Sequence, residues 1–186
     1  CSSDLPGRPR RSLRRRGGQA RAARRLHPEP NDPRARARGG AGGAARAVVI
    51  SLLDEGAKEI RLINRTRTKA DELASVDPSV VKTYEWANRH AALEGAAMLV
   101  NTTNQGMYGQ PPLEISLDAL PKSAMVSDLI YIPLETPLLT AARERGHLTV
   151  NGLGMLLNQA IPAFEAWFGV KPDITDELRQ AVLATF

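Results

Sequence analysis

Residues 39–67 read GGAGGAARAVVISLLDEGAKEIRLINRTR, and this stretch decides the fold that we expect for the chain. It opens on a glycine-rich turn, continues through a segment with apolar residues at helical spacing, and reaches a short apolar segment that predicts a strand. Gly40, Gly42 and Ala45 fit the spacing G-x-G-x-x-A, in which the glycines permit a tight turn and a close approach of a pyrophosphate to the backbone. Turn, helix and strand in this order indicate a dinucleotide-binding unit.

The segment after the turn predicts an amphipathic helix. Val48, Val49 and Leu52 recur on one face, and Gly56 is a suitable stop. A helix that begins at the turn directs its first N–H groups and the positive end of its dipole at a bound phosphate.

The end of the next strand, residues 59–63, indicates which dinucleotide is bound. An NAD site usually has an acidic residue here, which accepts a hydrogen bond from the ribose 2′-hydroxyl. This sequence has Asn64 instead, followed by Arg65 and Arg67. A guanidinium attracts a 2′-phosphate that a carboxylate would repel, so the sequence favours NADP over NAD. The alternatives are an ordinary glycine-rich loop and a solvated basic patch.

The charge of the chain is unevenly distributed. The 186 residues carry a formal net charge of +5, but residues 1–38 hold 12 Arg and 3 acidic residues, whereas residues 39–186 hold 13 Lys and Arg against 17 Asp and Glu. The first segment has too few aliphatic residues to form a core, so we expect it to be disordered or an artefact of translation in another reading frame. An Arg-rich arm that binds nucleic acid is a less favoured reading.

The residues just before the glycine turn are unsuited to their expected position. A dinucleotide-binding unit needs an apolar strand there, but residues 34–38 read RARAR, and we expect at most a weak strand. Cys1 is the single cysteine, so a disulfide or a cysteine-based zinc site within the chain is not expected and no metal is assigned. Without a secretory signal or a membrane-length apolar run, the sequence predicts a cytoplasmic protein that does not bind membranes.

The remaining sequence alternates between strands and helices. We expect strands over residues 80–84, 97–101, 124–129 and 148–151, and helices over residues 87–93, 116–120, 137–145, from 152 onward with Pro162 inside, and 174–184. This alternation predicts an α/β fold: a Rossmann-like, doubly wound, mostly parallel sheet with helices on both faces, plus C-terminal helices. The polar residues at the strand ends (Asn64, Asn101, Asp128 and Asn151) should converge where such sheets bind ligands.

Together these motifs resemble shikimate dehydrogenase. The resemblance covers residues 39–186 and rests on GAGGA at 40–44, NRT at 64–66, NTT at 101–103 followed by GM at 106–107, DLIY at 128–131, and GLGM at 152–155 with QA at 159–160. It implies NADP-dependent interconversion of 3-dehydroshikimate and shikimate in aromatic amino-acid biosynthesis.

The resemblance also implies roles for individual residues. Those around the pyrophosphate would be Gly40, Ala41, Gly42, Gly43 and Ala44. Those around the 2′-phosphate would be Asn64, Arg65, Thr66, Arg67, Thr68 and Lys69. Thr103, Leu129, Gly152 and Met155 would lie beside the nicotinamide, and Tyr131 and Gln159 would reach the substrate.

The family also has an N-terminal substrate domain with a catalytic Lys and Asp, and residues 1–38 do not match it. The first lysine is Lys58, in a turn of the cofactor domain. We therefore expect residues 39–186 to be an NADP-binding domain with C-terminal helices, which binds cofactor but turns over little substrate alone. An NAD-dependent quinate/shikimate dehydrogenase and a non-enzymatic NADP- or nucleic-acid-binding protein stay open as alternatives, and a homodimer is compatible with the sequence.

Overall fold

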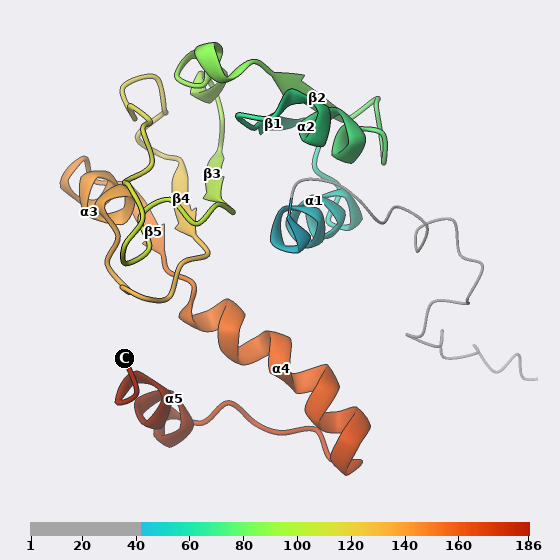
Figure 1. The fold of residues 1–186 in the computed structure, drawn as a ribbon, viewed down its shortest axis with the longest axis vertical. Coiled ribbons are helices and arrows are strands. Elements are labelled where there is room, and N and C mark those ends of the chain that lie inside the picture. The colour runs from blue at the N-terminus through green and yellow to red at the C-terminus, as the bar shows by residue number, and fades with distance from the viewer. Residues whose placement is uncertain (1–41) are drawn as a thin grey trace, which may run out of the picture. The chain divides into compact units, whose positions relative to one another are not determined.

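A computed structural model describes residues 42–186, which belong to one structural unit spanning Ala37–Phe186 (Figure 1). The expected strand over residues 34–38, the Arg-rich segment 1–38, and Gly40 and Ala41 lie outside the described residues. In chain order the elements are α1 (Gly43–Asp54), β1 (Ile60–Ile63), α2 (Arg67–Ala74), β2 (Val81–Tyr84), η2 (Trp86–Asn88), η3 (Ala91–Leu93), β3 (Met98–Asn101), β4 (Met125–Asp128), α3 (Pro137–Glu144), β5 (Leu148–Val150), α4 (Leu153–Phe168) and α5 (Asp176–Leu183).

Within residues 42–186 the strands form two parallel sheets. β1 pairs with β2, with Ile60 opposite Val81. The second sheet has the order β3-β4-β5, with Met98 opposite Met125 and Met125 opposite Leu148. Parallel pairing, with α2 between β1 and β2 and α3 between β4 and β5, confirms the predicted α/β class. The sheet expected to be continuous is in two parts, and β1 and β3 do not pair with each other.

Most predicted elements are present within one or two residues of their expected bounds. The helix after the glycine turn is α1, and Gly56 ends it with φ of +82°, a conformation that favours glycine. The helix expected over residues 87–93 is instead two short 3-10 turns, η2 and η3.

One expected helix is wrong and another was missed. Residues 116–120 form a turn, in which the amide of Leu120 donates to the carbonyl oxygen of Leu117. Ser116 Oγ lies 2.6 Å from Asp118 Oδ2 and accepts a hydrogen bond from the amide of Asp118, so local side-chain bonds replace a helical ladder. The missed element is α2, which begins directly after Thr66 and buries Ala70 and Leu73.

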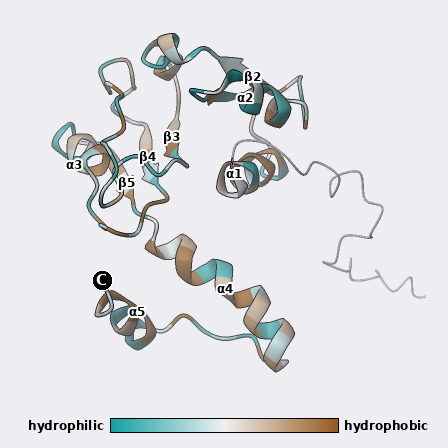
Figure 2. Cartoon of the chain, viewed as in Figure 1, coloured by the Kyte–Doolittle hydropathy of each residue, from teal (hydrophilic) through white to brown (hydrophobic). Residues whose placement is uncertain are grey.

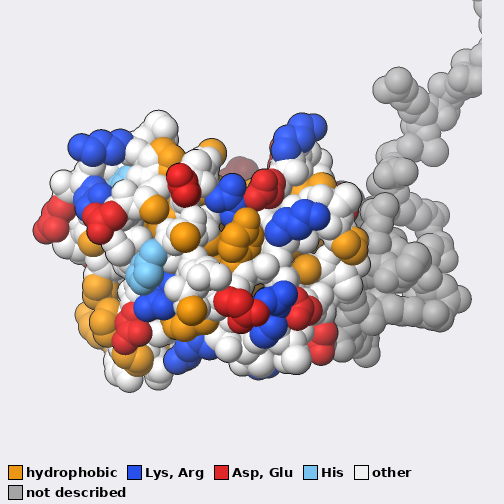
Figure 3. All heavy atoms as spheres, turned by 90° about the horizontal axis from the view of Figure 1, so that it is seen from above, with side chains coloured by type: hydrophobic (Ala, Val, Ile, Leu, Met, Phe, Trp, Pro, Cys, Tyr) orange, Lys and Arg blue, Asp and Glu red, His pale blue; other side chains and the backbone are white. Residues whose placement is uncertain are grey.

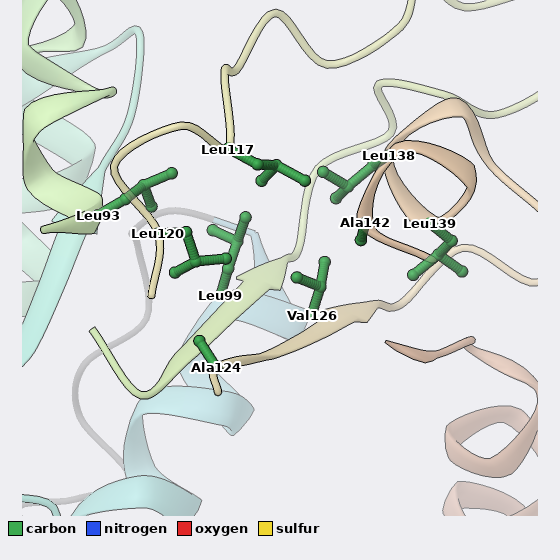
Figure 4. Packing of buried hydrophobic residues seen from close by; sticks show 9 residues of the cluster. All are labelled: Leu93, Leu99, Leu117, Leu120, Ala124, Val126, Leu138, Leu139 and Ala142. Atoms are coloured by element: carbon green, nitrogen blue, oxygen red, sulfur yellow. The ribbon is translucent and has the colours of Figure 1, made fainter. Parts of the chain in front are cut away.

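Each sheet has its own apolar core. Around β1 and β2 the buried residues are Ala45, Val49, Ile60, Leu73, Ala74 and Val81. Around β3 and β4 they are Leu93, Leu99, Leu117, Leu120, Ala124, Val126, Leu138, Leu139 and Ala142 (Figure 4). The strands contribute Ile60, Val81, Leu99 and Val126 to these cores, whereas Asn101 and Asp128 at the ends of β3 and β4 are buried polar residues.

The C-terminal part contains α4 and α5. α4 continues through Pro162 and ends at Gly169, whose φ is +70°. Apolar segments recur along α4 (Figure 2), and near its C-terminal end Trp167 and Phe168 are 78% and 64% exposed. α5 begins after Thr175, whose hydroxyl accepts a hydrogen bond from the amide of Leu178. Of the helices within residues 42–186, none has both the length and the apolar character that crossing a membrane requires.

Candidate dinucleotide site

The described end of the glycine turn, at the start of α1, is exposed and has open space beside it. Gly42 is the residue before the helix, and Gly42, Gly43 and Ala44 are exposed. A Cβ added at Gly42 or Gly43 would meet no atom within 4 Å. The first N–H groups of an α-helix have no partner within the helix, and the described residues leave space beside Gly42 and Gly43, an arrangement that fits a pyrophosphate.

The turn between β1 and α2 presents the residues predicted to meet a 2′-phosphate. Asn64 Oδ1 accepts a hydrogen bond of 3.2 Å from the amide of Thr66, which shapes the turn. Arg65 is exposed, and its guanidinium has no hydrogen-bond or ion-pair partner among residues 42–186. Thr66 makes no side-chain cap for α2, and Thr68 and Lys69 are exposed in the first turn of that helix. The turn therefore offers one uncommitted guanidinium.

Arg67 differs from Arg65, because its guanidinium is already paired. Its Nε lies 2.8 Å from Asp71 Oδ1 and 3.0 Å from Oδ2, and its Nη1 also contacts Glu85 Oε1. The hydrogen bond from Arg67 lowers the pKa of Asp71, and the same bond raises the pKa of Arg67. Arg67 thus neutralises carboxylates beside the turn.

A buried polar network joins the ends of β3 and β4. Asn101 Nδ2 donates to Asp128 Oδ1 at 3.0 Å, and Thr136 Oγ1 donates to Asp128 Oδ2 at 2.7 Å. The amide of Ile130 also donates to Asp128 Oδ1, at 3.1 Å. Burial raises the pKa of Asp128, and these three hydrogen bonds oppose that effect. Two of the polar strand ends expected to converge, Asn101 and Asp128, are therefore in direct contact.

The same network fixes Thr103. The Oδ1 atom of Asn101 accepts hydrogen bonds from the amide of Thr103 at 3.0 Å and from its hydroxyl at 2.7 Å. The Thr103 hydroxyl in turn accepts a bond of 3.1 Å from the amide of Gln105. Thr103 is exposed at the surface of this loop, so its position depends on Asn101 beneath it.

The start of α4 lies against the backbone that follows β4. The amide of Gly152 donates to the carbonyl oxygen of Ile130 at 3.0 Å. A Cβ at Gly152 would lie 2.1 Å from the carbonyl oxygen of Leu129, so only glycine fits without a shift of the backbone. Met155 is half-buried one turn later on the helix. This contact brings Gly152 and Leu129 together, as the sequence predicted for the nicotinamide side.

The two residues predicted to reach the substrate are in different surroundings. Tyr131 is half-buried, and its ring centroid lies 5.9 Å from that of Phe186 near the C-terminus. Gln159 is exposed on α4. No hydrogen bond joins these two side chains among the described residues.

The comparisons with known proteins agree with this geometry. Residues 152–183 match the family model described as the Shikimate 5′-dehydrogenase C-terminal domain. The chain is 57% identical over 145 residues to shikimate dehydrogenase (NADP(+)) of Dinoroseobacter shibae, an alignment that covers 78% of this chain and 52% of that protein. This part of the chain belongs to the shikimate dehydrogenase family.

Solved structures of the shikimate dehydrogenase type share the fold. The Thermus thermophilus enzyme in complex with NADP(H) and shikimate has a TM-score of 0.61 and 32% identity, covering 72% of this chain and 49% of that one. Quinate dehydrogenase from Corynebacterium glutamicum, in complex with NAD, has a TM-score of 0.69 and 29% identity, covering 78% and 53%. The chain spans about half the length of these relatives.

In this shikimate dehydrogenase relative, the sequence did not reveal how buried residues support the site. Asn101 and Asp128 were predicted as strand ends, but their mutual hydrogen bond was not. Thr136 was not singled out at all, although Thr136-Pro137 is a recognisable helix start: a hydroxyl residue followed by proline at the first helical position.

Proposed function

We propose that this chain supplies the NADP-binding part of a shikimate dehydrogenase, which interconverts 3-dehydroshikimate and shikimate. The observation that carries this proposal is Arg65, an exposed and uncommitted guanidinium just after β1, at a turn where Asn64 replaces the acidic residue of an NAD site. The 57% identity to a relative named for NADP(+) supports the same cofactor.

In this proposal the cofactor lies along the carboxyl ends of the strands. The N-terminus of α1, with Gly42, Gly43 and Ala44, would hold the pyrophosphate, and the preceding Gly40 and Ala41 would complete that turn. The 2′-phosphate would lie against Arg65, with Asn64, Thr66, Thr68 and Lys69 around it. Thr103, Leu129, Gly152 and Met155 would form the nicotinamide side. The bound cofactor supplies the hydride.

The protein's own groups orient the reacting molecules. Asn101 holds Thr103 through two hydrogen bonds, and Asp128 holds Asn101, so the loop beside the nicotinamide is fixed before cofactor binds. Tyr131 and Gln159 are proposed to contact the substrate, a small polyhydroxy acid. A cytoplasmic location and a homodimer are further parts of this proposal.

The proposal on Arg65 is tested by titrating the purified chain with NADP⁺ and with NAD⁺. We expect tighter binding of NADP⁺, and an Arg65→Ala variant should lose about 10- to 100-fold of its NADP⁺ affinity with little change for NAD⁺. Arg145→Ala is the matched control, because Arg145 is also exposed but pairs with Asp118 at 2.9 Å near the end of α3. Equal affinity for the two cofactors, or the same loss in both variants, would refute the role of Arg65.

A quinate/shikimate dehydrogenase that uses NAD is the second candidate, favoured by the similarity to the NAD complex of quinate dehydrogenase. Tighter binding of NAD⁺ than of NADP⁺ would decide for it. A nucleic-acid-binding role has less support, because residues 39–186 carry more acidic than basic residues. Figure 3 likewise shows Lys, Arg, Asp and Glu side chains intermixed on the visible face of the described residues.

A further inference from the structure

Asp128, at the end of β4, is a buried residue whose two carboxyl oxygens are both used inside the protein. It has no exposed surface. Its Oδ1 atom accepts hydrogen bonds from Asn101 Nδ2 at 3.0 Å and from the amide of Ile130 at 3.1 Å, and its Oδ2 atom accepts one from Thr136 Oγ1 at 2.7 Å. The Oδ1 atom is therefore shared by two segments, the loop after β3 and the backbone after β4.

The first of these segments leads to Thr103. Asn101 Nδ2 donates to the carbonyl oxygen of Gln105 at 3.2 Å as well as to Asp128, so two acceptors fix which way the side-chain amide is turned. In this orientation the Oδ1 atom of Asn101 accepts hydrogen bonds from the amide and the hydroxyl of Thr103. Through Asn101, the position of Thr103 thus depends on the carboxyl of Asp128.

The second segment leads to Leu129 and Gly152. The side chain of Asp128 accepts from the amide two residues further on, which closes an Asx turn. After this turn the carbonyl oxygen of Ile130 accepts a hydrogen bond of 3.0 Å from the amide of Gly152. The carbonyl oxygen of Leu129 lies so near that a Cβ on Gly152 would be 2.1 Å from it. Because this contact leaves no spare room, a shift of the turn would displace the start of α4.

Thr136 restrains the Asp128 carboxyl against rotation. It has no exposed surface, and its hydroxyl also accepts a hydrogen bond of 3.3 Å from the amide of Leu139 in α3. Leu139 lies in the apolar core of the same sheet (Figure 4). Both oxygens of Asp128 are therefore anchored, and the anchor of Oδ2 is a helix that core packing holds in place.

We propose that Asp128, restrained by Thr136, is a positioning residue for the nicotinamide half of the cofactor. This inference rests on the proposed function, in which Thr103, Leu129 and Gly152 lie beside the nicotinamide. One carboxyl sets the positions of both walls, because the hydrogen bonds from Asn101 and from the amide of Ile130 end on the same oxygen atom. Asp128 is fully buried, so it acts only through these neighbours.

The adenine end of the cofactor should not depend on this network. Its proposed anchor, Arg65, lies between β1 and α2, beside the other sheet. A positioning role therefore predicts that weakening the network lowers affinity only for ligands that carry a nicotinamide. A purely structural role predicts a general loss of stability and equal losses of affinity for every ligand of the site.

The test uses the full chain and two probes: NADPH, and adenosine 2′,5′-bisphosphate, which keeps the 2′-phosphate but has no nicotinamide. Thr136→Ala removes the donor to Asp128 Oδ2, and we expect it to weaken NADPH binding about tenfold while the affinity for adenosine 2′,5′-bisphosphate changes less than about twofold. Thr136→Ser keeps a hydroxyl and should recover most of the lost NADPH affinity. The matched control is Thr175→Ala, which removes the same kind of helix cap from α5 and should shift neither affinity.

Hydrogen exchange in the unaltered chain gives an independent measurement, which decides alone if Thr136→Ala fails to fold. NADPH should slow exchange at the amides of Thr103 and Ile130, whereas adenosine 2′,5′-bisphosphate should leave both unchanged. Equal losses of affinity for the two probes in Thr136→Ala would overturn the inference, as would protection of only one of these amides. If the unaltered chain binds NADPH no more tightly than adenosine 2′,5′-bisphosphate, this inference fails alone; if it binds neither probe, the proposed function fails with it.

Discussion

Asn101 Nδ2 donates a hydrogen bond of 3.0 Å to Asp128 Oδ1, and this contact joins the carboxyl ends of β3 and β4 in the interior. Asp128 has no exposed surface, and no cation lies against its carboxyl among the described residues. Buried carboxyls in such surroundings favour the protonated form. The pairing of these two residues therefore connects the proposed site to the pH dependence of folding.

Stability should fall as pH rises through the folded-state pKa of Asp128. Burial raises the pKa of this carboxyl above its unfolded value near 3.9, so the folded state binds the proton more tightly than the unfolded state does. The stabilisation that results is complete only at pH values below about 3.9 and is lost as the pH rises. In the window above 3.9 the slope can reach about 1.4 kcal/mol per pH unit. Asp128→Asn resembles the protonated acid, so urea unfolding between pH 4.5 and 8 should show a flatter dependence. An unchanged slope would contradict this assignment.

Asp128→Ala should behave differently from Asp128→Asn. Alanine leaves Asn101 Nδ2 and the amide of Ile130 without their shared acceptor, at a cost of at least about 2 kcal/mol. Urea unfolding of both variants at one pH measures the difference. Equal stabilities would mean that solvent reaches this network.

Two glycines at the start of α4 should respond in opposite directions to alanine. Gly152→Ala forces a Cβ to within 2.1 Å of the Leu129 carbonyl oxygen, so we expect a loss of about 1–3 kcal/mol. Gly154→Ala meets no atom within 4 Å and should stabilise the helix by up to about 1 kcal/mol. Thermal unfolding of the two variants measures both effects, and similar shifts in the same direction would exclude the close approach at Gly152.

Arg67 should affect NADP⁺ binding through its carboxylate partners. Arg67→Ala leaves Asp71 and Glu85 unneutralised beside the turn, so NADP⁺ affinity should fall, more at low salt than at high salt. Adding Asp71→Asn and Glu85→Gln to Arg67→Ala should restore most of the lost NADP⁺ affinity. If the triple variant stays as weak as the single one, Arg67 binds the phosphate directly.

The exposed aromatic residues at the end of α4 should cause self-association. Phe164 and Phe168 have ring centroids 4.6 Å apart, and Trp167 beside them is largely exposed. Sedimentation should detect oligomers that Trp167→Glu and Phe168→Glu reduce. Arg179→Glu on α5 is a charge-changing control at an intermediate position and should have no such effect.

The sequence predicted the elements well where periodicity was strong. α1, α3 and the four strands from residue 80 onward follow from apolar spacing and from glycines such as Gly56 and Gly146, both at positive φ. The turn at residues 116–120 was mistaken for a helix, because the bonds between Ser116 and Asp118 are a local choice that spacing does not reveal. α2 was missed because its sequence, RTKADELA, has a low apolar content, whereas α3 has the same length but is richer in apolar residues.

The sequence indicated which residues belong to the candidate site, but not which of them contact one another. Sequence order suggested that Arg65 and Arg67 act alike, yet only the fold places Glu85 against Arg67 and leaves Arg65 uncommitted. The separation of β1 from β3 among the described residues was not foreseen, because the sequence predicted a continuous sheet. Contacts between residues distant in sequence depend on tertiary packing, which a local pattern does not contain.

Thr136 uses one oxygen atom for two purposes, donating to Asp128 and accepting from the amide of Leu139 at the start of α3. Few amino acids at this position can therefore keep both hydrogen bonds. Serine preserves both bonds, whereas valine, which has nearly the same shape, removes the helix cap and the carboxyl's donor together. Variation here should be confined to the two hydroxyl amino acids, even where the neighbouring surface diverges freely.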